Sequence, residues 1–475
     1  MRHGGRFLGR HQRFDAIVIG AGQGGVPLAT SLAAIGEKTA IIEMDAIGGT
    51  CVNSGCTPTK TLIASARNAF QVSRSAHYGV SGIPQTYTVD MIRVRERKRD
   101  IVTMFRAGSE RRVADAANLT LVRGTASFLD SRSVSVRGAD GDASIIRADR
   151  IYINTGTRPA IPPIEGLESV SFLTNSSIME LDAVPEHLIV VGGGYIGVEF
   201  AQMFRRFGAR VTIVHHGSAL LSREDRDMSD ELAAILQAEG IEVILEAEPV
   251  SVISGPNITL DLRGAGGNRN ITGTHLLLAA GRRPNSDLLR LDAAGIGVDR
   301  RGNIIVNDRL ETTAEGIWAL GDVKGGPAFT HISYDDYRII MRNLYGDGKG
   351  TTSGRMVPYT VFTDPQIGRI GNTEEEARAS GRNIVIAKLP MDWVARALEL
   401  DETKGFMKAV VDVESGMILG FSMIGIDAGE VAGAMQIAMM GKLSYTELRD
   451  ATFSHPTLIE SLNNLFSTLP EPLPR

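Results

Sequence analysis

The sequence has 475 residues, of which 43% are hydrophobic and 22% charged, and this length and balance suit roughly three well-packed domains. Its formal net charge of -5 gives no electrostatic footprint for nucleic acid or for an anionic membrane surface. No apolar run approaches the ~18 residues needed to cross a bilayer, and two cysteines do not suggest a secreted disulfide scaffold, so we expect a soluble, cytoplasmic protein without a membrane or nucleic-acid partner.

The chain begins with a basic leader, MRHGGRFLGRHQRF, which contains no apolar stretch and no small-residue cleavage site. These features do not match a secretory signal peptide. We therefore expect the leader to be a disordered tail, with the first strand beginning near Asp15.

The first predicted unit is a buried strand over residues 14–19, a glycine-rich turn, a helix to about Ile35 and a second strand over residues 39–43. The turn has the pattern G-x-G-x-x-G, whose glycines are Gly20, Gly22 and Gly25. In this strand–turn–helix–strand context the pattern predicts a dinucleotide site, with the pyrophosphate at the helix N-terminus. Glu43 would accept hydrogen bonds from ribose hydroxyls.

The stretch GGTCVNSGCTPTK, residues 48–60, contains both cysteines of the chain, Cys51 and Cys56. A thiolate is the reactive form of cysteine, and a helix N-terminus beside a partner cysteine lowers the thiol pKa. We expect such a helix to run through Lys60 to about Phe70. The alternative is a pair of buried structural thiols.

A second unit of the same kind follows: a strand over residues 187–191, a glycine-rich turn, a helix through about Phe207 and a strand over residues 210–214. The residues of this turn that would bind a nucleotide are Gly192, Gly194, Tyr195, Ile196 and Gly197. Two nucleotide-binding units in one chain imply two cofactors.

The second unit lacks the acid of the first. Glu43 lies 23 residues after Gly20, whereas the position 23 residues after Gly192 is His215. A glutamate there would bind the 2′-hydroxyl of NAD and repel a 2′-phosphate. His215, with the nearby His216 and Arg223, can accommodate that phosphate, so we expect NADPH, with NADH the less favoured alternative; exposed histidines without this role are the other interpretation.

In this setting the two-cysteine motif resembles the redox-active disulfide motif of the class I pyridine nucleotide-disulfide oxidoreductases, the family of glutathione reductase, dihydrolipoamide dehydrogenase and mercuric reductase. Further landmarks are residues 152–159 (YINTGTRP), 281–285 (GRRPN), 319–322 (ALGD) and 455–460 (HPTLIE). Residues 55–60, 223–225 and 402–407 look like mercuric reductase. Residues 329–338 and 461–466 look like its relative, the copper-reducing flavoprotein of reactive-chlorine resistance.

The resemblance implies an α/β fold with two Rossmann-like domains, for FAD and for NAD(P), and a C-terminal α+β dimerisation domain. The expected boundaries are 1–158 and 285–350 for a split FAD domain, 159–284 for the NAD(P) domain and 351–475 for the dimerisation domain. Within the last domain, alternating residues 405–411 and 418–422 predict antiparallel strands, followed by a helix over residues 430–440.

The resemblance also implies a route for electrons, from nicotinamide to flavin to disulfide to acceptor. Cys56 would face the flavin and Cys51 would exchange with the acceptor. His455, oriented by Glu460 and contributed by the other subunit of a homodimer, would serve as the acid–base group.

Other roles carried over from the family concern residues around the two cofactors. Lys60 and Glu199 would form an ion pair beside the flavin N5, and Tyr195 would gate the nicotinamide pocket. The remaining FAD contacts would be Gly49, Thr50, Ala126, Thr155, Gly156, Asp322 and Thr330, and Gly281 would be a further NAD(P) contact. For each of these residues a packing role is the alternative, and no metal site is predicted.

We therefore expect an NADPH- and FAD-dependent oxidoreductase that reduces a disulfide or another thiol-reactive acceptor through Cys51. A metal-ion reductase acting on Cu(II) or Hg(II) is an alternative, although the tail of the chain lacks the cysteine pair of genuine mercuric reductases. A flavin redox sensor or electron-transfer partner is a hypothesis of another class. An activity like that of dihydrolipoamide dehydrogenase is disfavoured, because the NAD-selecting acid is missing.

Overall fold

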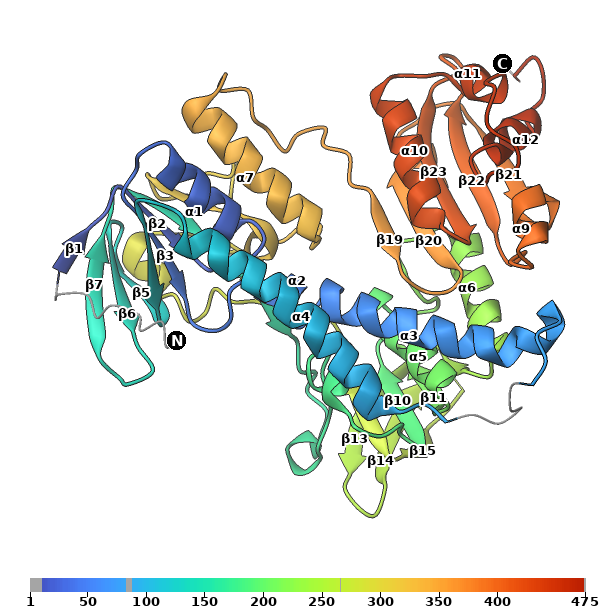
Figure 1. Ribbon diagram of the computed structural model, residues 1–475, viewed down its shortest axis with the longest axis horizontal. Coiled ribbons are helices and arrows are strands. Elements are labelled where there is room, and N and C mark those ends of the chain that lie inside the picture. The colour runs from blue at the N-terminus through green and yellow to red at the C-terminus, as the bar shows by residue number, and fades with distance from the viewer. Residues whose placement is uncertain (1–10, 83–87, 265, 474–475) are drawn as a thin grey trace. The chain divides into compact units, whose positions relative to one another are not determined.

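The computed structural model describes residues 11–82, 88–264 and 266–473 (Figure 1). The chain divides into two compact units, each built from three segments. Unit 1 comprises residues 1–62, 93–160 and 281–355, and unit 2 comprises residues 63–92, 161–280 and 356–475. The domain boundaries predicted from the sequence stay predictions, since unit 2 holds both the second nucleotide-binding segment and the C-terminal segment.

The leader is partly ordered. Its last residues form strand β1 (His11–Arg13), which pairs in parallel with β7 (Ala143–Arg147). The predicted disordered tail is therefore wrong for residues 11–13, because this pairing with a strand far along the chain leaves no local sequence signal. The rest of the leader, residues 1–10, lies outside the described residues.

Unit 1 is centred on a five-stranded sheet in the order β18-β8-β2-β3-β4, in which every neighbouring pair is parallel. Its strands are β2 (Ala16–Ile19), β3 (Thr39–Glu43), β4 (Leu119–Arg123), β8 (Arg150–Ile153) and β18 (Ile317–Ala319). The central strands are short buried runs, as expected when both faces of a parallel sheet are covered. One face packs with helices α1 (Gly25–Ala34) and α7 (Thr330–Tyr345), which lie together in Figure 1.

The other face of this sheet packs against a smaller sheet in the order β1-β7-β6-β5, through Phe128, Val134 and Ile146. The remaining elements that lie in unit 1 are β5 (Thr125–Asp130), β6 (Ser133–Arg137), β9 (Thr157–Pro159), β17 (Arg282–Pro284), α2 (Gly49–Asn53) and the 3-10 turns η4 (Leu291–Ala294) and η5 (Gly321–Lys324). Two longer helices, α3 (Cys56–Arg74) and α4 (Met91–Ala114), run across the boundary between the units.

Unit 2 contains a parallel sheet in the order β12-β11-β10-β16, which matches the predicted second nucleotide-binding segment. The elements of this segment are β10 (His187–Val191), α5 (Tyr195–Phe207), β11 (Arg210–Val214), α6 (Arg226–Ala238), β12 (Glu242–Ile244) and β16 (His275–Leu278). A three-stranded antiparallel sheet is inserted before the last strand, from β13 (Ala247–Ile253), β14 (Ile258–Gly264) and β15 (Arg269–Gly273). Short 3-10 turns are η1 (Ser75–Tyr78), η2 (Leu167–Ser169) and η3 (Ser177–Glu180).

The C-terminal part of unit 2 is a five-stranded antiparallel sheet in the order β19-β20-β23-β22-β21. Its strands are β19 (Tyr359–Val361), β20 (Gln366–Gly371), β21 (Ile384–Pro390), β22 (Phe406–Asp412) and β23 (Ile418–Gly425). The helices are α8 (Glu374–Ala379), α9 (Ala395–Glu399), α10 (Ala428–Met440), α11 (Tyr445–Arg449) and α12 (Ser461–Ser467), with η6 (Met391–Trp393). The predicted strand pair and helix are thus confirmed, and so is the predicted α/β class with two Rossmann-like sheets and a C-terminal α+β domain.

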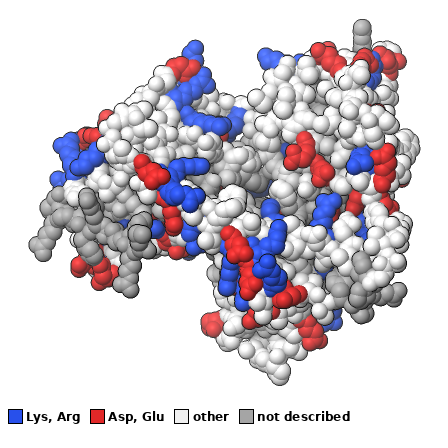
Figure 2. Space-filling model, in the orientation of Figure 1, with Lys and Arg blue, Asp and Glu red and all other residues white. Residues whose placement is uncertain are grey.

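Lysines and arginines are interspersed with acidic residues on the face shown in Figure 2. This mixture agrees with the small net charge of -5. Among the described residues, no helix is long and apolar enough to cross a membrane.

We expect the protein to lose stability in mild acid because of three histidines in unit 2. Burial lowers the pKa of His187, His215 and His275 below the ordinary 6.5, helped by Arg210 at His187 and by His216 at His215. Since the folded chain keeps these imidazoles neutral, the unfolded chain binds protons first as the pH falls. Their contribution to the free energy of unfolding is complete above pH ~6.5 and declines below it.

Urea unfolding followed between pH 7.5 and 5.5 should therefore show a midpoint that decreases as the pH falls. His275→Gln, which replaces the titrating ring with a neutral amide, should flatten that decrease. A midpoint that stays constant or rises toward pH 5.5 in the unmodified protein would contradict the assignment.

Candidate active site

The first glycine-rich turn packs as the sequence pattern predicts. Gly20 has a φ of +104°, and a Cβ there would lie 2.4 Å from the carbonyl oxygen of Asn154. A Cβ on Gly25 would lie 2.0 Å from the carbonyl oxygen of Gly20. Only glycine fits these two positions, because any side chain would push α1 away from the end of β2.

Glu43, at the end of β3, is tied to the same turn. Its carboxylate accepts hydrogen bonds from the backbone N–H of Ala21 at 2.7 Å and of Asp45 at 2.9 Å. A carboxylate has about four acceptor positions, so two remain for ribose hydroxyls. The acid therefore has a structural role in addition to the predicted one.

Asn154 was not singled out as a binding residue, although it lies in the YINTGTRP landmark. It is buried, and its Oδ1 has no hydrogen-bond partner among the residues that the structure describes. This oxygen faces the glycine turn, since a Cβ on Gly24 would lie 2.8 Å from it. A buried acceptor normally has a donor, so this position fits a ligand that carries hydroxyl groups. The turn and Asn154 together therefore fit a bound dinucleotide.

Asp322, in η5, lies in a polar network within unit 1. Burial raises the pKa of its carboxyl, and Arg282 and the Thr157 hydroxyl oppose that rise. The Thr157 hydroxyl donates to Asp322 at 3.1 Å and accepts from Arg282 Nε at 2.7 Å. These contacts fix one side of the carboxylate and leave other acceptor positions for a ligand.

A second buried acid, Asp336 on α7, supports this segment and was missed by the sequence analysis. It is fully buried and accepts from the backbone N–H of Gly321 at 2.8 Å. Lys324 at 3.3 Å and Arg355 at 2.7 Å compensate its charge. No sequence signal distinguishes Asp336 from its neighbour Asp335, because the contact depends on how α7 packs over η5.

The other predicted contacts of the first cofactor also lie in unit 1. Ala126 is buried in β5, and Thr50 is exposed in α2. The Thr155 hydroxyl donates to the Asn285 carbonyl at 3.1 Å. Gly156 has a positive φ of +65°. Gly281, which was predicted as a contact of NAD(P), also lies in unit 1 and has a φ of +112°.

The two-cysteine segment adjoins the first glycine turn. A Cβ on Gly49 would lie 2.8 Å from the Cα of Gly22, so the two backbones touch there. Cys51 lies in the short helix α2, and Cys56 is the first residue of α3, which runs through Lys60 as predicted and continues to Arg74. The two cysteines form no disulfide in the structure, and Cys56 is exposed whereas Cys51 is half-buried.

The electrostatics of Cys51 and Cys56 favour a state in which one of the two thiols keeps its proton. The neighbouring Cys56 sulfur raises the pKa of Cys51, and burial raises it further, while Thr330 and Lys60 lower it. The Cys56 Sγ lies 3.6 Å from the hydroxyl of Thr330, the first residue of α7. A thiolate at Cys56 would thus meet a hydroxyl and two helix N-termini, which stabilise negative charge.

The second glycine turn repeats the geometry of the first. Gly192 has a φ of +122°, and a Cβ on Gly197 would lie 1.9 Å from the Gly192 carbonyl oxygen. Around Gly194, by contrast, a Cβ would meet no described atom within 4 Å. Tyr195 begins α5 and is 38% exposed, and Ile196 is half-buried beside it. The open space at Gly194 and the side chain of Tyr195 thus lie where the sequence predicts that the second nucleotide binds.

The residues after β11 divide into a buried and an exposed set. His215 is buried, and its Nδ1 accepts from the Gly193 N–H at 3.2 Å, while burial lowers its pKa. A neutral, buried imidazole is a poor partner for a phosphate, so His215 holds the turn instead. His216 and Arg223 are exposed and available to a ligand.

Glu199 and Lys60, the predicted ion pair, lie in different units. Glu199 is buried on α5, and its carboxylate accepts from the Phe362 N–H at 2.8 Å. Lys60 lies in the second turn of α3, four residues after Cys56. The pairing of the two side chains stays a prediction.

His455 and Glu460 are brought together near the C-terminus. The Nδ1 of His455 lies 3.0 and 2.9 Å from the two carboxylate oxygens of Glu460. The histidine side chain is 69% exposed, and that of Glu460 is 30% exposed. Such a carboxylate fixes the tautomer of the ring and leaves Nε2 to exchange a proton.

Comparisons with known proteins agree with this geometry. Residues 14–336 match the model of the pyridine nucleotide-disulphide oxidoreductases, and residues 357–466 match that of their dimerisation domain. The chain is 40% identical over 459 residues to the probable pyridine nucleotide-disulfide oxidoreductase RclA of Escherichia coli (strain K12), covering 96% of this chain and 99% of RclA. It is 33% identical over 450 residues to the mercuric reductase of Bacillus cereus, covering 94% of this chain and 70% of that protein.

Among solved structures, the Cu(II) complex of the HOCl-induced flavoprotein disulfide reductase RclA from Escherichia coli has a TM-score of 0.88 and 38% sequence identity. The match covers 97% of this chain and 100% of that one. The similarity thus extends over both units.

Proposed function

Because this chain belongs to the pyridine nucleotide-disulfide oxidoreductase family, we propose that it passes electrons from NADPH through FAD to a Cys51–Cys56 disulfide and on to an acceptor disulfide or another thiol-reactive acceptor. The carrying observation is the thiol pair itself, which contains both cysteines of the chain and adjoins the first glycine turn. A cytoplasmic location, where thiols stay reduced, suits a pair that must cycle.

The residues of unit 1 suit FAD as the resident cofactor. The α1 N-terminus would hold its pyrophosphate, and hydroxyl-accepting groups would surround the rest, from Glu43, Asn154 and Asp322. Bound FAD would supply two-electron transfer between nicotinamide and disulfide. Lys60 and the N-terminus of α7 at Thr330 would provide positive potential beside it.

In unit 2 the second glycine turn would hold the nicotinamide dinucleotide. His216 and Arg223 are exposed after β11, where a 2′-phosphate would lie, and no acid at position 215 repels it. These contacts support NADPH over NADH.

The exchange with an acceptor disulfide requires only groups that the homodimer supplies. The Cys51 thiolate attacks one acceptor sulfur, an S–S bond to Cys51 forms, and the acceptor S–S bond breaks. His455, oriented by Glu460, gives a proton to the departing thiolate. Cys56 then attacks Cys51, which restores the Cys51–Cys56 disulfide and releases the second acceptor thiol. Since the Cys56 sulfur raises the pKa of Cys51, the histidine is also needed as the base that deprotonates Cys51.

We also propose a homodimer in which His455 completes the active site of the partner subunit. Helix α10 of the dimerisation domain exposes apolar side chains on one face, with Ile437 72% and Met440 64% exposed, whereas Met435 is fully buried. Such a face on a single subunit favours an interface.

Metal-ion reduction is a second candidate, since a similar solved structure is a Cu(II) complex and mercuric reductases are among the relatives. In this role the soft thiolate of Cys51 would meet the ion, because the chain has no further cysteine to deliver it.

The test is NADPH consumption by the FAD-loaded protein with a panel of small disulfides, Cu(II) and Hg(II), compared with Cys51→Ser. We expect a disulfide to support turnover that the variant loses. Turnover with the metal ions alone would favour the metal reductase. If no acceptor requires Cys51 while the thiols still change oxidation state, the protein is a redox sensor instead.

A further inference from the structure

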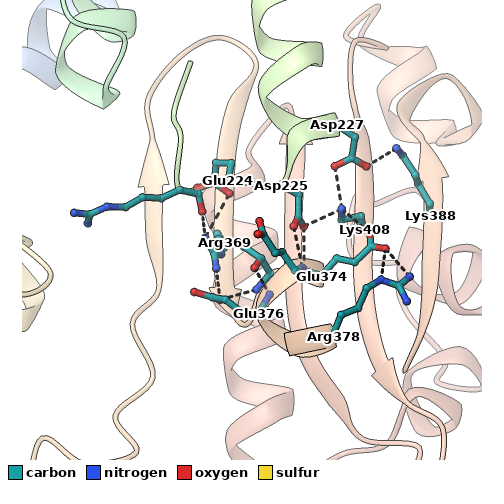
Figure 3. Close-up of polar contacts among 12 residues, drawn as sticks. Glu224, Asp225, Asp227, Arg369, Glu374, Glu376, Arg378, Lys388 and Lys408 are labelled. Carbon is teal, nitrogen blue, oxygen red and sulfur yellow. Dashed lines mark hydrogen bonds and ion pairs between the residues drawn. The ribbon is translucent and has the colours of Figure 1, made fainter. Parts of the chain in front are cut away.

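A cluster of charged side chains fastens residues 223–227, which are the end of the loop after β11 and the first residues of α6, onto the C-terminal sheet of unit 2 (Figure 3). Its members are Glu224, Asp225, Asp227, Arg369, Glu374, Glu376, Lys388 and Lys408. Four of these side chains are at most 9% exposed, namely those of Glu224, Asp225, Arg369 and Lys408. Exposed surface ion pairs contribute little, whereas a withdrawn cluster fixes the segments that carry it.

Arg369, on β20, is the member of the cluster that contacts Arg223, the candidate contact of the 2′-phosphate. Its Nη1 donates to the backbone carbonyl of Arg223 at 2.8 Å, and its Nη2 donates to Glu376 at 2.9 Å. The side chain is only 9% exposed. The guanidinium therefore holds the main chain of Arg223, while the Arg223 side chain is exposed.

Glu224 is held in the same place. Its side chain is 3% exposed, it accepts from the Tyr359 hydroxyl, and it lies 3.8 Å from Arg369. Burial raises the pKa of Glu224, and Arg369 with the Tyr359 hydroxyl opposes that rise. Because Arg223 and Glu224 are consecutive, both the carbonyl of one and the side chain of the next are fixed by Arg369.

Lys408, on β22, contacts the residues at the start of α6. Its side chain is 2% exposed, and its ammonium contacts Asp225 at 2.8 Å, Asp227 at 2.9 Å and Glu374 at 3.2 Å. Asp225 is the N-cap residue of α6. The start of α6 is therefore fastened to the same sheet as Arg369.

The fastened segment also contacts the glycine turn. The N–H of Leu221 donates to the Gly193 carbonyl at 2.9 Å, and the Gly193 N–H donates to His215 at 3.2 Å. The glycine turn, the loop after β11 and the cluster thus form one continuous set of hydrogen bonds within unit 2.

We propose that Arg369 is a positioning residue for cofactor selectivity, which fixes the backbone of Arg223 so that its guanidinium meets the 2′-phosphate of NADPH. This inference rests on the proposed function, in which Arg223 contacts that phosphate. Selectivity between NADPH and NADH is then set partly by Arg369 of the C-terminal sheet, which lies 146 residues along the chain from Arg223. A free loop would have to lose conformational entropy on binding, whereas an anchored one does not.

The variants are chosen so that no carboxylate is left buried without a partner. Glu224→Gln keeps an acceptor for Tyr359 and serves as the background, and Arg369→Gln is added to it. Arg378→Gln is the matched control, because Arg378 pairs with Glu374 at 2.7 Å but is 58% exposed. Arg223→Gln measures the phosphate contact itself.

The FAD-loaded proteins are titrated calorimetrically with 2′,5′-ADP and with 5′-AMP, which differ only in the 2′-phosphate. We expect Glu224→Gln/Arg369→Gln to bind 2′,5′-ADP about tenfold more weakly than Glu224→Gln, as for one charge-assisted hydrogen bond. The affinity for 5′-AMP should change less than about twofold, and the Arg378→Gln control should match the unmodified protein. In turnover, the KM for NADPH should rise while kcat is retained.

Adding Arg223→Gln to the double variant should weaken 2′,5′-ADP binding no further, because both changes remove the same contact. Equal losses for both ligands, or none, would overturn the inference. If Arg223→Gln alone weakens 2′,5′-ADP but the double variant does not, only the inference fails. If Arg223→Gln has no effect, the NADPH contact in the proposed function fails, and the inference fails with it.

Discussion

Replacing Cys51 by serine is expected to reduce NADPH-dependent turnover of a disulfide acceptor on the order of 1000-fold or more, because a hydroxyl can neither form the mixed disulfide nor carry the electrons. Cys56→Ser should have an effect of the same order. With Cys56 absent, a mixed disulfide at Cys51 cannot be resolved within the chain, since there is no third cysteine.

The control for both variants is the reduction of ferricyanide, which accepts electrons from a flavin without thiols. Ferricyanide reduction should stay within about twofold of that of the unmodified protein if the variants lose only the electron transfer through the two thiols to the acceptor. Thiol counting gives an independent measurement, because the chain has two cysteines. Alkylation followed by mass spectrometry should show two free thiols after NADPH treatment and none after oxidation. Disulfide turnover that persists in Cys51→Ser would refute the exchange mechanism.

The nucleotide-binding halves could be predicted from sequence because their signals are local. The strand, the glycine turn and the first turns of the helix lie within a dozen residues, and Gly20 and Gly192 meet their steric neighbours as the pattern requires. The strand β1 could not be predicted in this way, since His11–Arg13 is ordered by pairing with β7, more than 100 residues later.

In the candidate site, too, the features with a local sequence signal could be predicted and those that depend on distant contacts could not. The thiol pair and the His455–Glu460 contact follow from motifs of a few residues. The residues that support these groups do not follow from such motifs. Asp336, for example, accepts from the Gly321 N–H only because of how α7 packs. His215 was assigned to a phosphate by its offset from Gly192, but the offset says nothing of burial, and the structure turns the ring toward Gly193.

The ion cluster on residues 223–227 was equally invisible from sequence. The run of residues 223–225 resembles mercuric reductase, and the negative charges of Glu224 and Asp225 beside Arg223 are, from the sequence alone, an objection to a phosphate contact there. In the structure, Glu224 and Asp225 are turned into the C-terminal sheet and compensated by Arg369 and Lys408. Their charge is therefore neutralised there, which removes the objection to Arg223 as a phosphate contact.

The second large effect is expected at His455. His455→Ala should lower disulfide turnover by roughly 100- to 10,000-fold, the usual contribution of a general acid–base group. Glu460→Gln should cost less, since it keeps a hydrogen-bond acceptor for Nδ1 but removes the charge that stabilises the imidazolium. Ferricyanide reduction should again be unaffected, and a similar loss of that activity would indicate damage to the fold.

Mixing variants tests whether His455 acts on its own chain or on the partner. His455→Ala and Cys51→Ser homodimers are each expected to be almost inactive. In a heterodimer with one variant in each chain, the intact Cys51 and the intact His455 lie on different subunits. If the histidine serves the partner's thiols, one of the two sites is complete, and the heterodimer should recover about half the activity of the unmodified dimer. If it serves its own chain, both sites stay defective and no activity returns, which would refute the shared site.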